Sequence, residues 1–311
     1  MQAKAIKLLL RYPVYAFILE DYLNLDEFKD LSPLTISSKR LTLVSLMNYL
    51  GDNKILDFHH CMQNNVSEYL TSLKGLSSST ISGRTFILRH FFNFLSSREY
   101  SLFTGNELFP VIFTNKRERI LSFYSVKEIK SVVSIIDRNT SYGKRDFAVV
   151  LLAAELGIRS GDIIRLKKSD IHWERDTIEF VQYKTKIFNQ LPLLENIKYA
   201  LLDYFKNSRP TTDSEYIFIG IKNGRKPLSN TIIHQIISKY FKKAGIDISE
   251  RKHGPHAMRH SLASSMLHNN TPMYVIKEVL GHSNINTTQM YLNIDTDTLR
   301  RLALEVPYET I

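Results

Sequence analysis

Residues 145–166 read "RDFAVVLLAAELGIRSGDIIRL" and decide how the second half of the chain folds. Their long apolar run is typical of a buried helix. Gly157 predicts a turn after that run, and a second helix is expected to begin near Ser160. Arg159 stands between the two. Burying an arginine is costly unless it meets an anion, although an arginine at this place could also cap a helix or pair with a carboxylate.

The next informative segment, residues 177–193, reads "TIEFVQYKTKIFNQLPL". It alternates and is rich in β-branched and aromatic residues, which predicts two strands joined by a tight turn. Lys184 and Lys186 lie in that turn, where a lysine is usually only surface charge. Helical patterns return from about residue 228 to the end. We therefore expect a mainly α-helical domain with a small antiparallel β-sheet.

Residues 253–267, "HGPHAMRHSLASSML", predict a helix that begins after a Gly-Pro pair. His256, Arg259 and His260 share one face of that helix. A zinc ion bound by the two histidines is an alternative, but the glutamate of an HExxH motif is absent and no third ligand is evident. Histidine and arginine at a helix N-terminus are better suited to an anion. We expect no metal.

A fourth polar segment, "LGHSNINTTQMYL", spans residues 280–292. His282 begins it at a turn, and Tyr291 follows nine positions later. The chain has sixteen tyrosines, so Tyr291 considered alone is more readily a core residue than a catalytic one.

Together, the four segments contain the groups needed to cleave a phosphodiester. Arg159 and Arg259 can hold its non-bridging oxygens and stabilise the charge that builds up on phosphorus. Histidine can transfer protons near neutral pH, and lysine can protonate a leaving alkoxide. Tyr291 can act as the nucleophile that divides one phosphoryl transfer into two. The set predicts a strand exchange that requires neither metal nor cofactor.

The first hundred residues predict helices, and two of these carry basic residues. Residues 34–53 place apolar residues at helical spacing and are expected to end at Gly51. Residues 76–100 do the same after a serine-rich start, with an apolar set that includes Phe86. The basic residues of their polar sides could be a solvated face or could contact phosphates: Lys39, Arg40, Arg84 and Arg89.

Helical periodicity is lost after residue 100, which indicates a boundary between two domains. We expect a helical N-terminal domain over residues 1–105, a linker over 106–122 and a second domain over 123–311, with its own C-terminal tail helix. Ser125 and Glu128 have the spacing of a capping box at the start of the second domain.

The composition favours a polyanionic partner. The net charge is +10, the pI is about 9.4, and 43% of residues are hydrophobic, the profile of a globular protein that could bind nucleic acid. No apolar run approaches the roughly 20 residues that span a bilayer. The single cysteine, Cys61, excludes an intrachain disulfide framework and fits a reducing compartment. We expect a cytoplasmic protein with no membrane partner.

The motifs of the second domain resemble those of the tyrosine recombinase family, the phage integrase and Xer type. "LGIRSGDIIRL" is similar to the family's first arginine motif, with Arg159 at the arginine and Asp162 at an acidic position where glutamate is common. "YKTKIFNQLPL" is similar to the hairpin lysine segment. Lys184 is the match because it lies eight residues before Pro192, and Lys186 is the alternative.

The remaining motifs complete the resemblance in the same order. "HAMRH" is similar to the H-x-x-R box with His256 and Arg259, and "LGHSNINTTQMYL" is similar to the closing motif with His282 and Tyr291. The N-terminal domain resembles the helical, SAM-like core-binding domain by pattern only. The resemblance implies a two-domain, C-shaped clamp around double-stranded DNA.

The resemblance also implies the reaction. Tyr291 would attack the scissile phosphate to give a 3′-phosphotyrosyl bond and a free 5′-hydroxyl, which the 5′-hydroxyl of a partner strand later reverses. The other residues would clamp the phosphate or move protons: Arg159 and Arg259 as clamps, Lys184 as the acid, His256 in proton transfer, His282 as a hydrogen-bond donor and Asp162 in support.

Further expectations concern assembly and use. The resemblance implies a homo-tetramer on two DNA sites with inverted-repeat cores, a Holliday junction intermediate and a monomer in free solution. Chromosome dimer resolution, integration of a phage or other mobile genetic element, and inversion all share this chemistry. The alternatives are a topoisomerase of type IB, which would relax supercoils without recombination, a catalytically silent DNA-binding regulator with the same fold, and an unrelated helical scaffold.

Overall fold

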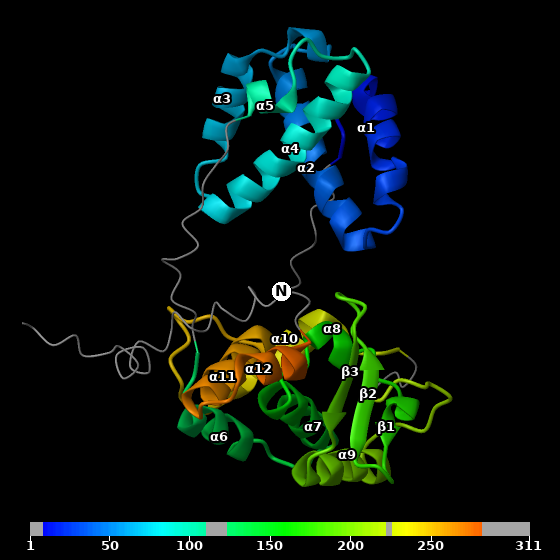
Figure 1. Ribbon diagram of the computed structural model, residues 1–311, viewed down its shortest axis with the longest axis vertical. Helices are drawn as coiled ribbons and strands as arrows, with labels where there is room; N and C mark the ends of the chain where they lie inside the picture. Colours follow the sequence, from blue (N-terminus) through cyan, green and yellow to red (C-terminus); the bar gives the residue numbers. More distant parts are fainter. Residues whose placement is uncertain (1–8, 110–122, 222–225, 282–311) are drawn as a thin grey trace, which may run out of the picture. The chain divides into compact units, whose positions relative to one another are not determined.

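The computed structural model describes residues 9–109, 123–221 and 226–281. The chain forms two compact units, Met1–Arg119 and Ile120–Ile311. Figure 1 draws the first unit in blue to cyan and the second in green to orange. Each unit has its own hydrophobic core.

The described residues of the N-terminal unit form helices joined by turns and irregular segments. Its α-helices and 3₁₀-helices (η) are η1 (Pro13–Tyr15), α1 (Ala16–Leu23), η2 (Asp26–Phe28), α2 (Pro33–Asp52), η3 (Phe58–His60), α3 (Gln63–Ser72), α4 (Ser78–Ser97) and α5 (Gly105–Leu108). Side chains of Ser32 and Ser77 cap α2 and α4 by accepting hydrogen bonds from backbone N–H groups three residues on, at 3.2 and 3.3 Å. The serine-rich start predicted for α4 is confirmed.

Packing in this unit corrects two expectations. Gly51 lies inside α2 and does not end it, because the helix continues to Asp52. The ring of Tyr12 packs so closely that a Cβ on Gly51 would lie 2.3 Å from its Cδ2. Phe86 is exposed, whereas Leu88, Phe91, Phe92 and Leu95 of the same helix are buried.

The predicted linker begins too early. Helix α5 (Gly105–Leu108) begins one residue before the predicted linker and includes the linker's first three residues. A capping box of Thr104 and Glu107 stabilises that helix. Leu108 and Phe109 are buried in the core of the N-terminal unit. The residues from 106 to 109 are therefore part of a folded domain. The rest of the predicted linker, residues 110–122, lies outside the described residues.

The C-terminal unit is mixed, as predicted. Its elements are α6 (Val126–Ser134), α7 (Ser141–Glu155), α8 (Ser160–Ile163), η5 (Lys168–Asp170), β1 (Ile171–His172), β2 (Thr177–Val181), β3 (Phe188–Pro192), α9 (Glu195–Asn207), α10 (Asn230–Lys243), α11 (Pro255–His268) and α12 (Met273–Leu280). The capping box of Ser125 and Glu128 opens α6, as expected.

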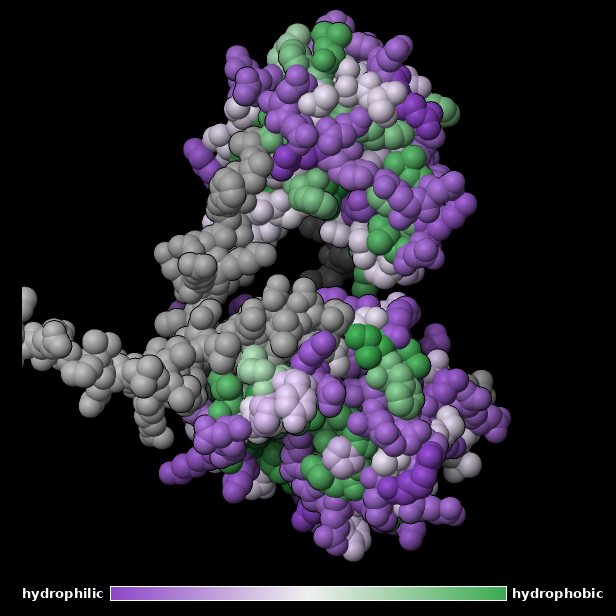
Figure 2. Space-filling model, viewed as in Figure 1, coloured by the Kyte–Doolittle hydropathy of each residue, from purple (hydrophilic) through white to green (hydrophobic). Residues whose placement is uncertain are grey.

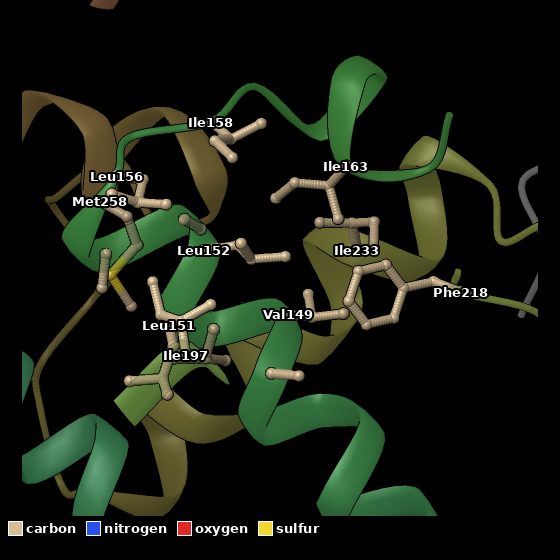
Figure 3. Packing of buried hydrophobic residues seen from close by; sticks show 14 of the residues in the cluster. Val149, Leu151, Leu152, Leu156, Ile158, Ile163, Ile197, Phe218, Ile233 and Met258 are labelled. Carbon is tan, nitrogen blue, oxygen red and sulfur yellow. The ribbon is translucent and has the colours of Figure 1, made fainter. Parts of the chain in front are cut away.

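Helix α7 is the centre of the second core. Its residues from Ala148 to Ala154 are all buried, which confirms the helix predicted from the apolar run. Figure 3 shows side chains of this helix packed among others that the surrounding elements contribute: Ile163, Ile197, Phe218, Ile233 and Met258. This packing fixes the helix end from which Gly157 and Arg159 emerge.

The sheet has three antiparallel strands in the order β1-β2-β3. Ile178 pairs with Leu191 and Val181 with Phe188, so β2 and β3 form the predicted hairpin. Ile178 and Phe180 face the core, while Val181 and Phe188 are exposed. Figure 2 shows a hydrophobic patch near the turn end of this hairpin. The alternation of the sequence thus sets which face of the hairpin is buried.

One long helix was not expected. Helix α9 lies before residue 228, where helices were predicted to resume, and it packs against α7. Its buried residues recur at helical spacing: Ile197, Ala200, Leu201 and Tyr204. None of the helices in the described part of the chain is both long and apolar enough to cross a membrane.

Candidate functional site

Arg159 reaches the site through a glycine turn. Gly157 follows α7 with a φ of +61°, and a Cβ there would lie 2.9 Å from a methyl carbon of Leu280, so both conformation and space favour glycine. Arg159 then occupies the N-cap position of α8. Its guanidinium donates to the Gln182 side-chain oxygen and, at 3.4 Å, to the carbonyl of Gly281.

Arg259 comes from α11 and meets the same place. Its side chain is only 5% exposed, and Nη1 donates to the carbonyl oxygen of Gly157 at 2.7 Å. Nη2 donates to the carbonyl oxygen of Leu280. Both predicted arginines therefore converge on the C-terminal end of α12, where peptide carbonyls that lack helical partners accept hydrogen bonds.

The hairpin turn is tied to the Arg159 segment by Asp162. This carboxylate is 4% exposed, and Oδ1 accepts from the backbone N–H of Tyr183 at 2.7 Å. Burial raises the pKa of Asp162, an effect that the Tyr183 N–H and nearby arginines partly offset. The Arg165 guanidinium also stacks over the Tyr183 ring, 3.6 Å from its centroid. Asp162 thereby fixes the backbone next to Lys184, which is exposed.

His256 lies in the first turn of α11, and its surroundings connect the segments. Partial loss of hydration lowers the pKa of His256, although the residue retains exposed surface, and the positive charges of Arg259, Lys184 and Arg159 lower the pKa further. The imidazole is therefore neutral near pH 7 and able to accept a proton. Three predicted residues, Arg159, Lys184 and Arg259, thus lie within electrostatic reach of a fourth, His256.

His260, the third residue of the predicted face on α11, is held neutral more strongly. Burial lowers its pKa to about 4, with further contributions from His256, Arg259 and Lys252. Among residues 9–109, 123–221 and 226–281, no group of three or more His, Cys, Asp or Glu side chains could hold a metal ion.

The remaining two predicted residues, His282 and Tyr291, lie outside the described residues. The chain is described up to Gly281, which follows α12 in the left-handed conformation with a φ of +58°. His282 is therefore covalently attached to the residue whose carbonyl accepts from Arg159.

Sequence reasoning missed Gln182, which is 2% exposed and contacts Arg159, Thr185 and Leu280. A signal was present in the alternation of the strand. Ile178 and Phe180 face the core, and Gln182 is the next residue of that face. A polar side chain at a buried position needs hydrogen-bond partners, so its place in the pattern indicates a specific set of contacts.

The four basic residues predicted on the N-terminal helices are engaged within that unit. Lys39 does not lie on a polar face: it is 8% exposed, and its Nζ lies 3.9 Å from the ring centroid of Phe28. Arg40 forms a two-pronged ion pair with Glu20. Arg89 donates to Asn106, and Arg84 interacts with the hydroxyl of Tyr69.

Two family models match the chain. The model of the phage integrase family matches residues 123–297, and the model of the phage integrase N-terminal SAM-like domain matches residues 19–99.

Curated relatives match along most of the chain. The tyrosine recombinase XerD of Staphylococcus epidermidis is 30% identical over 92% of this chain and 96% of its own length. The tyrosine recombinase XerC of Bacillus pumilus is 28% identical over 93% of both chains. A putative integrase/recombinase of Sinorhizobium fredii, y4gC, is 34% identical over 57% of this chain and 90% of its own length.

Solved structures share the fold. The XerH site-specific recombinase bound to a palindromic difH substrate, in a post-cleavage complex, superposes with a TM-score of 0.74 at 19% identity and covers 92% of this chain and 83% of its own. A lambda integrase dimer bound to a COC′ core site gives 0.72 at 16% identity, with 90% and 95% covered. With the family models and the relatives above, these matches establish that the chain belongs to the phage integrase family, the tyrosine recombinases that cleave DNA and exchange its strands.

Proposed function

We propose that this recombinase cleaves DNA with Tyr291 as its nucleophile, held by the site around Arg159, Lys184, His256 and Arg259. The observation that carries the proposal is the convergence of Arg159 and Arg259 on the end of α12, together with the positive charges of both arginines and Lys184 that act on His256. That end leads directly to His282 and onward to Tyr291 in the sequence.

The proposed step exchanges one phosphoester bond for another. The Tyr291 oxygen bonds to phosphorus as the bond to the 5′-oxygen breaks, and the strand end remains attached as a 3′-phosphotyrosine. Neutral His256 receives the tyrosine proton, and Lys184 gives a proton to the departing 5′-oxygen. Arg159, Arg259 and His282 stabilise the charge on the non-bridging oxygens. Attack by a partner strand's 5′-hydroxyl reverses the step, so the bond energy is conserved without ATP.

The proposal extends to assembly and domain roles. Residues 123–311 carry out the chemistry, and the helical unit that precedes residue 110 contacts the DNA core site. Four copies act on two double-stranded sites with inverted repeats, through a Holliday junction, in the cytoplasm. The DNA-bound XerH and lambda integrase structures with this fold support a duplex DNA partner.

A covalent trapping experiment tests the nucleophile. A duplex that the wild-type protein binds is selected from a random-sequence pool and then nicked near the cleavage site, so that the released fragment diffuses away. Wild type is expected to give a protein–DNA adduct that resists SDS, and Tyr291→Phe is expected to give none. Tyr308→Phe is the matched control and should form the adduct normally. An adduct formed by Tyr291→Phe would show that another residue is the nucleophile.

A further inference from the structure

Gln182 occupies a buried position between three parts of the site. It directly follows β2, and its backbone begins the hairpin turn: its N–H donates to Ile187 at 2.9 Å and its carbonyl accepts from Lys186 at 2.9 Å. Its side chain is 2% exposed. A buried amide without hydrogen-bond partners would destabilise the folded state by roughly 1–3 kcal/mol. The hydrogen bonds of this side chain are therefore needed for the stability of this part of the fold.

The amide group joins Arg159 to the end of α12. Oε1 accepts from the Arg159 guanidinium and from the Thr185 hydroxyl, the latter at 2.8 Å. Nε2 donates to the carbonyl oxygen of Leu280 at 3.3 Å. The orientation of the amide follows from chemistry, because a rotated amide would point N–H groups at a guanidinium and an oxygen at a carbonyl.

The side chains closest to glutamine in shape and chemistry do not meet these requirements. Glutamate would accept from Arg159 but could not donate to Leu280, methionine would fill the volume without either bond, and asparagine is one methylene shorter. A glutamine is therefore the residue that both orients the arginine and fastens it to α12.

We propose that Gln182 is a positioning residue for DNA cleavage, which holds the Arg159 guanidinium in place and locks the hairpin and the end of α12 into one arrangement. The proposal rests on the proposed function, in which Arg159 contacts the scissile phosphate. Gln182 itself touches Arg159 and does not touch DNA. Replacement of Gln182 would displace the Arg159 guanidinium, whose alignment with the phosphate controls the rate of cleavage. In other enzymes a displacement of this kind lowers the rate by roughly 100-fold.

The chain offers a matched control in Asn189. This second buried amide, on β3, is 7% exposed and donates to the carbonyl of Val279 at 3.4 Å. It joins the same sheet to the same helix, one residue earlier, through a bond that involves no arginine. The changes Gln182→Met and Asn189→Leu both replace an amide with an apolar group of similar shape.

The first measurement compares cleavage with binding. The full chain reacts with the selected, nicked duplex under single-turnover conditions, and DNA affinity is measured separately by band shift. We expect Gln182→Met to lower the rate of adduct formation by roughly 10- to 100-fold and to change affinity by less than about threefold. Asn189→Leu should change both by less than about threefold. Equal losses in the two variants would reduce Gln182 to a packing residue and overturn the proposal.

The second measurement identifies the group through which Gln182 acts. A methylphosphonate at the scissile position lacks the charge that Arg159 neutralises, so the deficit of Gln182→Met should shrink to less than about threefold. A 5′-bridging phosphorothiolate leaves without the Lys184 proton, and on it the deficit should persist. The reverse pattern would assign the effect to the hairpin lysine and overturn the Arg159 assignment.

The outcomes separate this proposal from the one it rests on. A wild type that forms the Tyr291 adduct beside an unimpaired Gln182→Met variant would refute the positioning role alone. A wild type without any adduct would refute the proposed function, and the positioning role with it. The fluorescence of Trp173, in the C-terminal unit, verifies that each variant is folded at the assay temperature.

Discussion

Replacement of Gly281 by alanine is expected to weaken the C-terminal unit at the point where α12 ends. Gly281 has a φ of +58°, and a Cβ there would lie 1.9 Å from Nε2 of Gln182. The glutamine side chain could move, but it is buried and would lose its bonds to Arg159 and Leu280.

The magnitude has two parts. An alanine in the left-handed conformation costs about 1–2 kcal/mol. The loss of one hydrogen bond to a charged group and one neutral hydrogen bond adds about 2–4 kcal/mol. Gly245→Ala isolates the first part, because Gly245 has a φ of +69° with no atom within 4 Å of the added Cβ. The free energy of unfolding should therefore fall about 2–4 kcal/mol further in Gly281→Ala than in Gly245→Ala.

The assay uses a probe confined to one unit. The chain contains a single tryptophan, Trp173, whose ring lies 6.1 Å from that of Phe205 in the C-terminal unit. Urea unfolding followed by its fluorescence reports on this unit and not on the N-terminal one. If the two variants lost the same stability within about 0.5 kcal/mol, the argument that Gln182 is anchored beside Gly281 would be wrong.

Two further predictions concern His260 and Lys39. Because the folded pKa of His260 is about 4 and its ordinary value is 6.5, the unfolded chain binds a proton in this interval that the folded chain does not. Stability is therefore lost as pH falls from 6.5 to 4, by up to about 3 kcal/mol, and His260→Gln should remove this part of the loss in urea titrations at several pH values; an unchanged pH dependence would contradict it. Lys39→Met should leave the slope of log Kd against log salt unchanged in DNA binding, because the ammonium is buried over Phe28. A slope reduced by about one would instead mean that Lys39 contacts a phosphate.

Local patterns predicted the elements that carry the site. The apolar run before Gly157, the alternation around Phe180 and the Gly-Pro start of α11 each correspond to the observed helix or strand. In each case the signal lies within one segment: a period of apolar residues and a residue that ends it.

Such local patterns could not predict the contacts between segments that are distant in the sequence. Lys39 is buried because Tyr22 and Phe28, from earlier helices, surround it, and its own helix gave no sign of this. The side chain of Gln182 has specific hydrogen-bond partners in Arg159 and Leu280, which lie 23 and 98 positions away in the sequence. The motif order predicted a set of candidate site residues, whereas the partners of those residues became visible only in the packed structure.

The hydrogen bonds that hold Arg159 and Arg259 have a consequence for the attraction of DNA. Acceptors of their guanidinium N–H groups include an amide oxygen and the peptide oxygens of Gly157, Leu280 and Gly281, and these oxygens are uncharged. A carboxylate in their place would cancel much of each guanidinium's charge, and an incoming phosphate would have to compete with it. The peptide oxygens at the end of α12 instead orient both guanidinium groups without adding a negative charge of their own, so that the buried Asp162 is the carboxylate whose charge acts on both arginines.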